Sequence, residues 1–301
     1  MNQSNSYNNP SVREDLSDII TNLSPKETQF SSGLKKTKAT AVNHEFLTDT
    51  DLITTNTSAD KKEIEGANFR DDNIVNPVRK VNYTQIISQA FKVTGTEQAT
   101  THAGMKNPYT YHEAKAMVAY KHKLEWSVLF GVKNAGSATV AREMSGAFDA
   151  ITTNRVDAAG AALTETLFNN YLQMAWEKSS SPVDEVYVGI ALKRRISGFT
   201  AGATKSVESK DKRLVNAVDV YESDMGIVKI FPHRLINSVL TAPGTHNMLM
   251  ISSQTWKLAE LRAPKTYTAA KVGDADKGVI IGEVTLEFLS EESNVAVKNL
   301  K

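Results

Sequence analysis

The sequence predicts an α+β fold, and three features along the chain predict it. Residues 107–132 combine helix formers with apolar side chains at helical spacing, which predicts one long helix. Extended, glycine-punctuated sequence precedes this helix, and a compact segment of mixed helix and strand character follows it. Two runs with strand character then close the chain.

The composition is that of an ordinary folded protein. Of 301 residues, 41% are hydrophobic and 23% are charged, which is enough to build a core. The 35 basic and 34 acidic side chains leave a formal charge of +1, so the chain as a whole cannot hold a polyanion by bulk electrostatics. The chain has no cysteine, which excludes disulfides, thiolate nucleophiles and cysteine-bound metals. The N-terminus lacks a signal-peptide pattern and no apolar run reaches the roughly 18 residues of a membrane span, so we expect a soluble chain without a membrane partner.

Residues 1–38 are polar and rich in Asn and Ser, apart from a short apolar pattern at residues 16–23. Such a segment cannot bury enough surface to order itself. We therefore predict an extended N-terminal arm, which is either a free tail or ordered against a neighbouring chain.

Residues 39–76 predict a long hairpin-like excursion. Two extended arms, at 38–49 and 62–69, flank a polar tip at 54–60, and Glu65-Gly66 marks the return. A structureless loop of this size is unusual inside a compact domain, so we expect the excursion to contact something else. Lys61 and Lys62 near the tip would either reach acidic or amide side chains of a neighbour or simply keep the loop soluble.

The next elements are strands at 81–87 and 91–93, a turn or bulge at 94–96, and the long helix at about 110–132. A helix of this length spans roughly 33 Å. Thr110 and Glu113 have capping-box spacing, and Asn107-Pro108 marks the entry. The stripe expected to pack consists of Ala114, Met117, Val118, Leu124, Val128 and Leu129. The side expected to meet solvent or neighbours carries Lys115, Lys121, Lys123 and Glu125.

Beyond the helix, the pattern predicts a second helix at 162–178, a strand at 185–188, and a short helix that Gly198 caps. Residues 216–231 predict a hairpin that turns at 224–226. The last 36 residues predict two strands, at 266–271 and 279–290, around a tight connection. In the second of these strands Glu283, Thr285 and Glu287 alternate with apolar residues, so they point to the opposite face of the strand.

The sequence predicts no catalytic, cofactor or metal site. It contains none of the common signatures of phosphate, dinucleotide, zinc-protease or hydrolase sites. His112 and His122 share the long helix but lie about 80° apart around its axis, so they do not form a metal-binding pair. Asp274 to Gly278 resembles the opening of a calcium loop, but its glycine comes fifth and not sixth, which favours a plain hairpin turn.

A basic cluster lies between residues 193 and 213. It consists of Lys193, Arg194, Arg195, Lys205, Lys210, Lys212 and Arg213. Such a cluster can contact phosphates or the acidic edge of another subunit. A solvated charged face is equally compatible with it, because no interleaved aromatic platform accompanies the charges.

Several stretches in order carry a family resemblance: AVNHEFLTDTDL, KKEIEGANF, RKVNYTQIISQAFKVTGTEQAT, YHEAKAMVAYKHKLEWSVLFG, VYVGIALKRRISGF and VDVYESDMGIVKIFPHRLI. With them, the chain resembles the major capsid proteins of tailed bacteriophages that have the Hong Kong 97-type fold. The resemblance runs from about residue 25 to the end of the chain.

The resemblance implies a division of the chain into four parts. These are an N-terminal arm at 1–38, an extended loop at 39–76, a peripheral domain at 77–145 and 263–301 with the long helix as its spine, and an axial domain at 146–262. Contacts between subunits are then expected at Lys61, Lys62, Glu63, Glu65, Arg194 and Arg195.

The resemblance also implies a function and partners. Copies of the chain would form hexamers and pentamers of an icosahedral or prolate head shell around double-stranded DNA, assembled in the host cytoplasm and present in the virion. The partners would be the chain itself, a portal, scaffold or decoration proteins, and the packaged DNA without sequence specificity. The alternatives are an encapsulin-like nanocompartment shell, another phage structural protein, or a DNA-binding protein that uses the 193–213 cluster.

Overall fold

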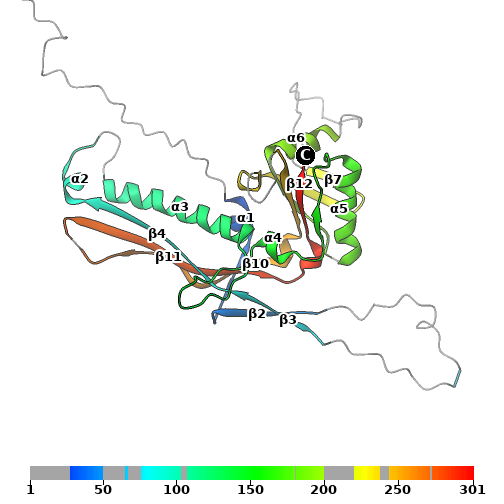
Figure 1. Ribbon diagram of the computed structural model, residues 1–301, viewed down its shortest axis with the longest axis horizontal. Helices are drawn as coiled ribbons and strands as arrows, with labels where there is room; N and C mark the ends of the chain where they lie inside the picture. The colour runs from blue at the N-terminus through cyan, green and yellow to red at the C-terminus, as the bar shows by residue number, and fades with distance from the viewer. Residues whose placement is uncertain are drawn as a thin grey trace, which may run out of the picture. The chain divides into compact units, whose positions relative to one another are not determined.

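A mixed six-stranded sheet organises the second half of the chain. The computed structural model describes residues 28–49, 65–66, 76–102, 107–179, 181–199, 220–237, 244–271 and 273–301. Across the sheet the strands are β5 (Arg155–Asp157), β12 (Val295–Leu300), β9 (His246–Ile251), β6 (Glu185–Val188), β8 (Gly226–Pro232) and β7 (Val220–Ser223). The pairs β5–β12 and β6–β8 are parallel, and the other neighbours are antiparallel. The C-terminal strand is therefore enclosed between two strands that precede it by many residues (Figure 1).

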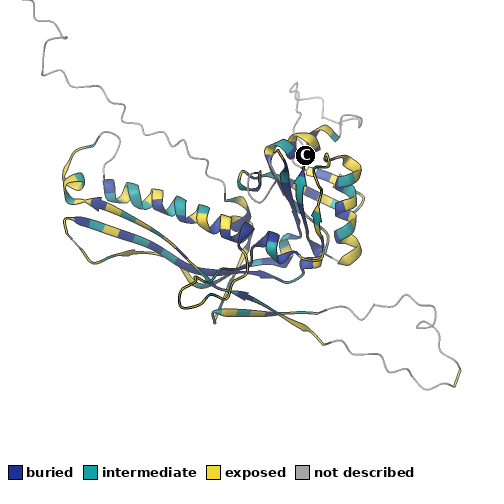
Figure 2. Cartoon of the chain, viewed as in Figure 1, coloured by how far each residue is buried: buried dark blue, intermediate teal, exposed yellow. Residues whose placement is uncertain are grey.

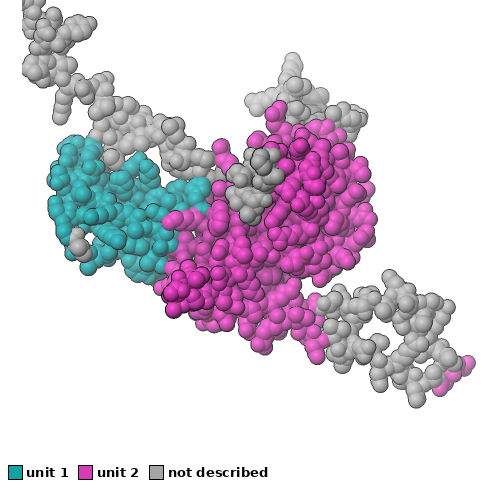
Figure 3. Space-filling model, in the orientation of Figure 1, with its two compact units in different colours: residues 1–26, 88–122, 264–281 teal, residues 27–87, 123–263, 282–301 magenta. Residues whose placement is uncertain are grey.

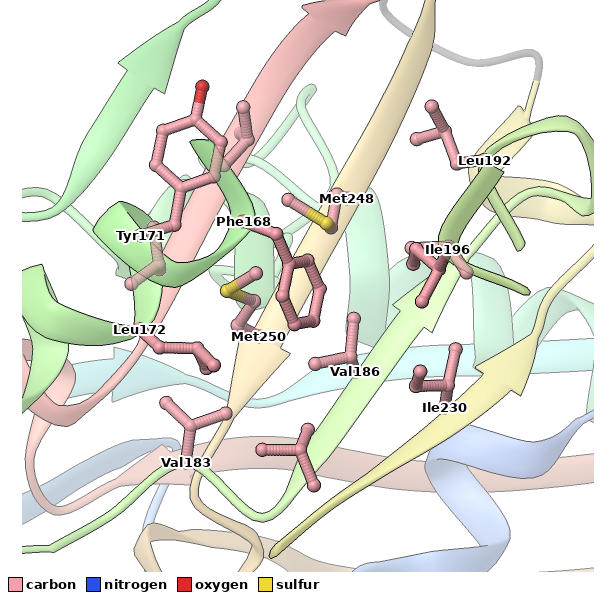
Figure 4. Packing of buried hydrophobic residues seen from close by; sticks show 14 of the residues in the cluster. Phe168, Tyr171, Leu172, Val183, Val186, Leu192, Ile196, Ile230, Met248 and Met250 are labelled. Carbon is pink, nitrogen blue, oxygen red and sulfur yellow. The ribbon is translucent and has the colours of Figure 1, made fainter. Parts of the chain in front are cut away.

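Two helices, α5 (Glu165–Lys178) and α6 (Ile190–Phe199), cover one face of this sheet. Val186 and Val188 of β6 turn toward the helices, whereas Tyr187 between them faces the other side, as strand alternation requires. Figure 4 shows the resulting core, with Phe168 of α5 among the sheet residues. The α5 helix begins at Glu165, three residues later than predicted, because Thr164 caps it: the Thr164 hydroxyl accepts a hydrogen bond from the backbone of Leu167.

The first half of the chain contributes to a four-stranded sheet and a separate ribbon. The sheet has the order β1 (Lys35–Lys38), β10 (Trp256–Thr268), β11 (Ala275–Phe288) and β4 (Gln85–Thr94). The ribbon pairs β2 (Asn43–Thr48) with β3 (Val78–Tyr83) in antiparallel register. The helices are α1 (Gln29–Gly33), α2 (Gly95–Ala99), α3 (Pro108–Phe130) and α4 (Ala147–Ala150), with short 3₁₀ turns at 235–237, 253–255 and 291–293. Within the described residues, no helix is both long and apolar enough to span a bilayer.

The chain divides into two compact units (Figure 3). Of the described residues, the first unit comprises those within 88–122 and 264–281, and the second comprises those within 28–87, 123–263 and 282–301. In the first unit the rings of Phe91 and Tyr109 lie 5.0 Å apart, and the backbone of Gly95 donates to Asp274. The second unit holds the six-stranded sheet, the β2–β3 ribbon and the C-terminal part of α3.

The long helix is confirmed, but its cap and its packed face differ from expectation. The side chain of Asn107 accepts from the backbones of Tyr109 and Thr110, so Asn107 is the cap and the predicted Thr110–Glu113 box is wrong. Leu124, Val128 and Leu129 are buried as expected, and Met117 and Val118 are partly buried.

Two positions on that helix were assigned to the wrong side. Ala114 is exposed and Glu125 is completely buried. The reason is visible in Figure 2, where the C-terminal turns of α3 are almost entirely buried and the N-terminal turns are not. A stripe read at constant period cannot anticipate a helix whose burial changes along its length.

Other predicted elements also differ. Residues 28–38 do not belong to a free arm, because Phe30 is fully buried and β1 pairs with β10. The turn expected at 94–96 is the start of α2, with Thr94 as its cap. Gly198 lies inside α6 and does not cap it. The strands β9 and β12 were missed, and β12 pairs with strands of the predicted axial domain although the sequence placed residues 263–301 in the peripheral one.

Several local predictions are confirmed. The hairpin at 216–231 is present from Val220 onward, with its turn at Asp224-Met225. The hairpin turn expected at 274–278 is confirmed only in part, because Asp274 lies in the connection but β11 already begins at Ala275. Asp276 is therefore a strand residue, and its carboxylate accepts from Gln98. Glu65 and Gly66 form a turn, with Gly66 at φ +82°. The expected helix at 16–23, the loop tip at 54–60 and the rest of the arm at 62–69 lie outside the described residues.

Two glycines allow the chain to pass close to the end of α3. A Cβ on Gly146 would lie 2.7 Å from the backbone nitrogen of Gly131 and 2.8 Å from the carbonyl of Leu129. The backbone of Gly146 also donates to the carbonyl of Gly131 at 2.8 Å. Only glycine permits this approach of two backbones.

We therefore expect Gly146→Ala to lower the free energy of unfolding by about 1–3 kcal/mol, because backbone must shift to admit the methyl group. Chemical denaturation of the purified chain measures this. Gly198→Ala is the matched control, since nothing lies within 4 Å of the added Cβ and the residue is helical. Its expected effect is a stabilisation of roughly 0.5–1 kcal/mol. Equal destabilisation by both substitutions would contradict the assignment of Gly146 to a close approach.

Candidate assembly surfaces

The structure places only some of the residues predicted to contact other subunits. Lys61, Lys62 and Glu63 lie outside the described residues, and Glu65 is exposed in its turn. Arg194 and Arg195 are both exposed on α6. The described structure therefore does not bring the loop residues and the helix residues together.

The β2–β3 ribbon ends in exposed apolar side chains. Leu47 is 62% exposed and Val78 is 57% exposed, at the end where the register closes with Thr48 opposite Val78. The ribbon forms a sheet of its own, and an isolated two-stranded ribbon is only marginally stable in water. Its conformation must therefore be fixed by contacts at its other end.

Those contacts are made with β11 and with the segment after α3. The buried amide of Asn82 donates to the carbonyls of Leu286 at 2.7 Å and Ser145 at 3.2 Å, and its oxygen accepts from the backbone of Ser145 at 2.8 Å. The ring of Phe46 meets that of Phe288 edge-on at 5.0 Å. The inner end of the ribbon is thus held firmly while its outer end remains exposed.

Two glutamates of β11 add to this anchor. Glu283 accepts from the hydroxyl of Thr84 at 2.8 Å, from Arg142 at 3.0 Å and from Arg262 at 2.9 Å. Glu287 accepts from Thr37 at 3.3 Å and is paired with His44 and Lys257. In the sequence both glutamates alternate with apolar residues and so lie on the polar face of the strand, yet both are buried. The alternation did not reveal this burial, because segments distant in sequence cover the second face of the strand.

Among the acids that the structure describes, Glu125 is the most deeply buried. Its carboxylate accepts from the backbones of Phe30 at 2.9 Å and Ser31 at 2.8 Å, and lies 2.7 Å from the Nε2 atom of His233. Burial alone would raise the pKa of Glu125, but the hydrogen bonds from His233 and Ser31 outweigh it and hold the pKa below its ordinary value. The carboxylate is therefore charged, fully bonded and structural.

Glu291 is a second buried carboxylate that hydrogen bonds from a distant segment hold in place. This carboxylate accepts from the backbones of Thr152 at 2.9 Å and Thr153 at 3.1 Å, and from both hydroxyls at 2.9 and 2.7 Å. Burial opposes ionisation, yet these four bonds lower the pKa of Glu291. Sequence reasoning missed this residue, because a Glu in a loop gives no local signal of its distant partners.

A groove of about 630 Å³ runs along α6, and its lining includes Ile190, Arg194, Arg195 and Pro232. Lys193 is buried and its Nζ atom donates to the carbonyl of Ile230 at 2.9 Å. The interpretation of Lys193 as part of a surface cluster was therefore wrong, because the aliphatic chain lets it reach inward. Lys205, Lys210, Lys212 and Arg213 fall outside the described residues, so Arg194 and Arg195 are the members of the cluster that the structure shows on the surface. No group of three potential metal ligands occurs among the described residues.

The sequence matches the family described as SU10 major capsid protein over residues 1–301. The chain belongs to this family. It is accordingly a major capsid protein of the tailed-phage type, which forms the head shell of the virion, and it is not an enzyme.

Solved structures show the same fold. The chain is similar to a structure from Gordonia phage Cozz, with a TM-score of 0.65, 10% identity, and coverage of 97% of this chain and 92% of that one. It is also similar to the capsid of Myoviridae phage XM1, with a TM-score of 0.61, 12% identity, and coverage of 94% and 96%. The holo-SrpI encapsulin complex of Synechococcus elongatus gives a TM-score of 0.56 at 10% identity, with coverage of 94% and 92%. No curated protein sequence matches the chain. The Hong Kong 97-type fold expected from the sequence is confirmed.

Removing the charge of Glu125 should destabilise the fold. We expect Glu125→Gln to lower the free energy of unfolding by about 3 kcal/mol, because an amide group cannot satisfy two backbone donors and His233 as a carboxylate does. Chemical denaturation followed by circular dichroism measures the loss. Glu113→Gln on the same helix is the control, with an expected change within about 0.5 kcal/mol.

The effect of Glu125 should depend on pH. Because its folded-state pKa is lowered, its contribution is complete above the unfolded pKa of about 4.3 and is lost as the pH falls toward the folded-state value. The difference in unfolding free energy between the wild type and Glu125→Gln should therefore shrink progressively as the pH falls below about 5. A difference that grows on acidification would contradict the lowered pKa.

Proposed function

We propose that copies of this chain form hexamers and pentamers, and that these build a closed head shell around double-stranded DNA. The observation that carries the proposal is the β2–β3 ribbon, which is rigidly anchored at one end and exposes Leu47 and Val78 at the other. In an isolated subunit, apolar side chains that stay in water add nothing to the free energy of folding. A neighbouring subunit that covers them gains their burial at about 25 cal/mol per Å².

We further propose that residues 1–27 and 50–75 contact neighbouring subunits, with Lys61, Lys62, Glu63 and Glu65 among the contact residues. Their polar composition supports this, because such segments gain order mainly against another chain. Residues 77–145 with 263–294 would form the peripheral domain. Residues 146–262 would form the axial domain, to which the pairing of β12 adds residues 295–300.

The proposed partners beyond the chain itself are the packaged DNA, a portal, and scaffold or decoration proteins. The formal charge of +1 supports a shell that encloses DNA without binding its phosphates tightly. A portal is proposed because a closed shell needs a point of entry for DNA.

A nanocompartment shell is the second candidate, since the fold is also similar to that of an encapsulin. The two functions differ in content, because an encapsulin-like shell would enclose protein cargo. A DNA-binding function based on the 193–213 cluster has less support, since Lys193 is buried and bonded to the backbone.

Electron microscopy of the chain expressed alone, with sedimentation to measure the assembled fraction, tests the proposal. We expect closed shells, tubes, or rings of five or six. Nuclease-protected DNA inside particles from infected or co-expressing cells would favour the head shell, whereas protein cargo would favour the nanocompartment. A monomer at every concentration and salt, with and without its phage partners, would count against both.

Neighbouring residues of β2 provide a sharper test. Leu47→Asp should leave the free energy of unfolding within about 0.5 kcal/mol of the wild type, because the side chain is exposed. It should nevertheless reduce the assembled fraction at least about tenfold, since an unpaired carboxylate in an interface costs well over 1.4 kcal/mol.

Phe46→Asp is the matched control, because residue 46 points to the opposite side of the strand and is buried against Phe288. This variant should lose stability itself, as seen in its melting curve. If Leu47→Asp assembled normally, the proposal that the β2–β3 ribbon lies in an interface between subunits would be wrong.

A further inference from the structure

We infer that neighbouring copies join head to tail through two patches at opposite ends of strand β8, an inference that rests on the proposed assembly into rings. One patch is the groove beside α6. The other is the outer face of the β7–β8 hairpin. The partner of each patch is therefore the other patch on a second copy of the chain.

The hairpin patch consists of apolar and acidic side chains. Val220 is 53% exposed and Ile227 is 61% exposed, while Glu222 lies directly across from Ile227 in the register. Tyr221 and Val228 point into the core beneath the two helices, so their strand neighbours must point to the opposite face. That face of the hairpin is left uncovered by the described residues.

The position of β7 supports an interface as well. It is the last strand in the described six-stranded sheet, so one side of its backbone has no sheet partner there. Proteins usually cover or blunt such an edge, because it pairs readily with other chains. Here the edge carries an exposed apolar residue, Val220, which a neighbouring subunit would cover.

The groove patch consists of apolar and basic side chains. Ile190 is 60% exposed at the start of α6, next to the exposed Arg194 and Arg195. Neither arginine has an ion-pair partner within the described residues. A second copy can therefore supply their counter-charges without breaking an existing pair.

The two patches are complementary in charge. The hairpin carries Glu222 and Asp224 against one exposed cation, Lys229, whereas the groove carries two guanidinium groups. Opposed charges at a rim set orientation and suppress wrong pairings, and the apolar residues supply the burial. The groove volume of about 630 Å³ is sufficient for aliphatic side chains of the size of Val and Ile.

Their placement also fits a ring. Pro232, which lines the groove, ends β8, and Gly226, which follows the hairpin turn, begins it. Ile227 of the hairpin and Pro232 of the groove lie five residues apart along β8, or roughly 17 Å. The hairpin patch also faces away from the two helices, so it cannot enter the groove of its own copy. Two different patches on one rigid body make a head-to-tail contact, and such a contact closes into a ring when the rotation permits.

Disulfide trapping tests the contact directly, because the chain contains no cysteine. Ile190→Cys combined with Ile227→Cys should give, after oxidation of the assembled protein, a ladder of covalent oligomers on a non-reducing gel. The ladder should end at five or six copies, since each ring is then closed. The single variants should give dimers at most.

Val132→Cys combined with Ile227→Cys is the matched control, because Val132 is 58% exposed but belongs to neither patch. Assembled particles that give no ladder with the Ile190 pair, or the same ladder with the Val132 pair, would overturn the inference while leaving the proposed function intact. Failure of the wild type to assemble at all would instead count against the proposed function and, with it, the inference.

Charge reversal provides an independent measurement. Arg194→Glu with Arg195→Glu should reduce assembly about tenfold, and so should Glu222→Arg with Asp224→Arg, at unchanged melting temperature. Combining all four substitutions should restore assembly to near the wild-type level. Loss without recovery in the combined variant would show that the two patches do not face each other.

Discussion

The second unit depends on buried carboxylates that are fully supplied with donors. Glu125 is completely buried, and Glu283, Glu287 and Glu291 are at most 8% exposed. A carboxylate without partners could not remain charged in such places, because its desolvation costs several kcal/mol. Each one is instead bonded to segments far away in the sequence, such as Phe30 with Glu125 and Arg142 with Glu283. These buried contacts contribute less to net stability than to the uniqueness of the fold, because each carboxylate keeps its charge only in an arrangement that brings its distant donors to it.

This constraint explains how a subunit can hold exposed apolar surfaces without collapsing onto them. The ribbon is fixed by Asn82 and by the contact between Phe46 and Phe288, so Leu47 cannot fold back to bury itself. The hairpin at Val220 and Ile227 is likewise fixed by its strand pairing within the sheet. Because the ribbon and the hairpin are already fixed within the subunit, little conformational entropy is lost when a neighbour covers these residues. Several such contacts per subunit then add up through effective concentration, although each alone is weak.

How much the sequence could predict follows from the range of the interactions. The helix α5 and the β7–β8 hairpin were predicted well, because their signals are local: an apolar stripe along the helix and a turn at Asp224-Met225. The burial of Glu125 was predicted wrongly, because its partners Ser31 and His233 lie about 100 residues away in either direction along the chain. The strand β12 was missed for the same reason, since its place between β5 and β9 is decided by pairing and not by its own pattern. Lys193 was predicted to lie on the surface but is buried. Adjacent charged residues suggested one surface cluster, although successive residues of a helix point to different sides.

The residues that bind neighbouring subunits are specific to this chain's own surface. Identities of 10% and 12% to phage structures of the same fold show that the fold is shared, but they do not carry individual contact residues over to this chain. What the chain itself supplies is a set of exposed apolar residues on rigid supports and a formal charge of only +1.

Identical subunits that carry a large net charge repel one another, whereas nearly neutral ones do not. Local charge then decides which surfaces meet, because an acidic hairpin and a basic groove attract each other while two hairpins or two grooves repel. A nearly neutral subunit with charges separated in this way favours head-to-tail contact over face-to-face pairing, and head-to-tail contact is what a ring requires.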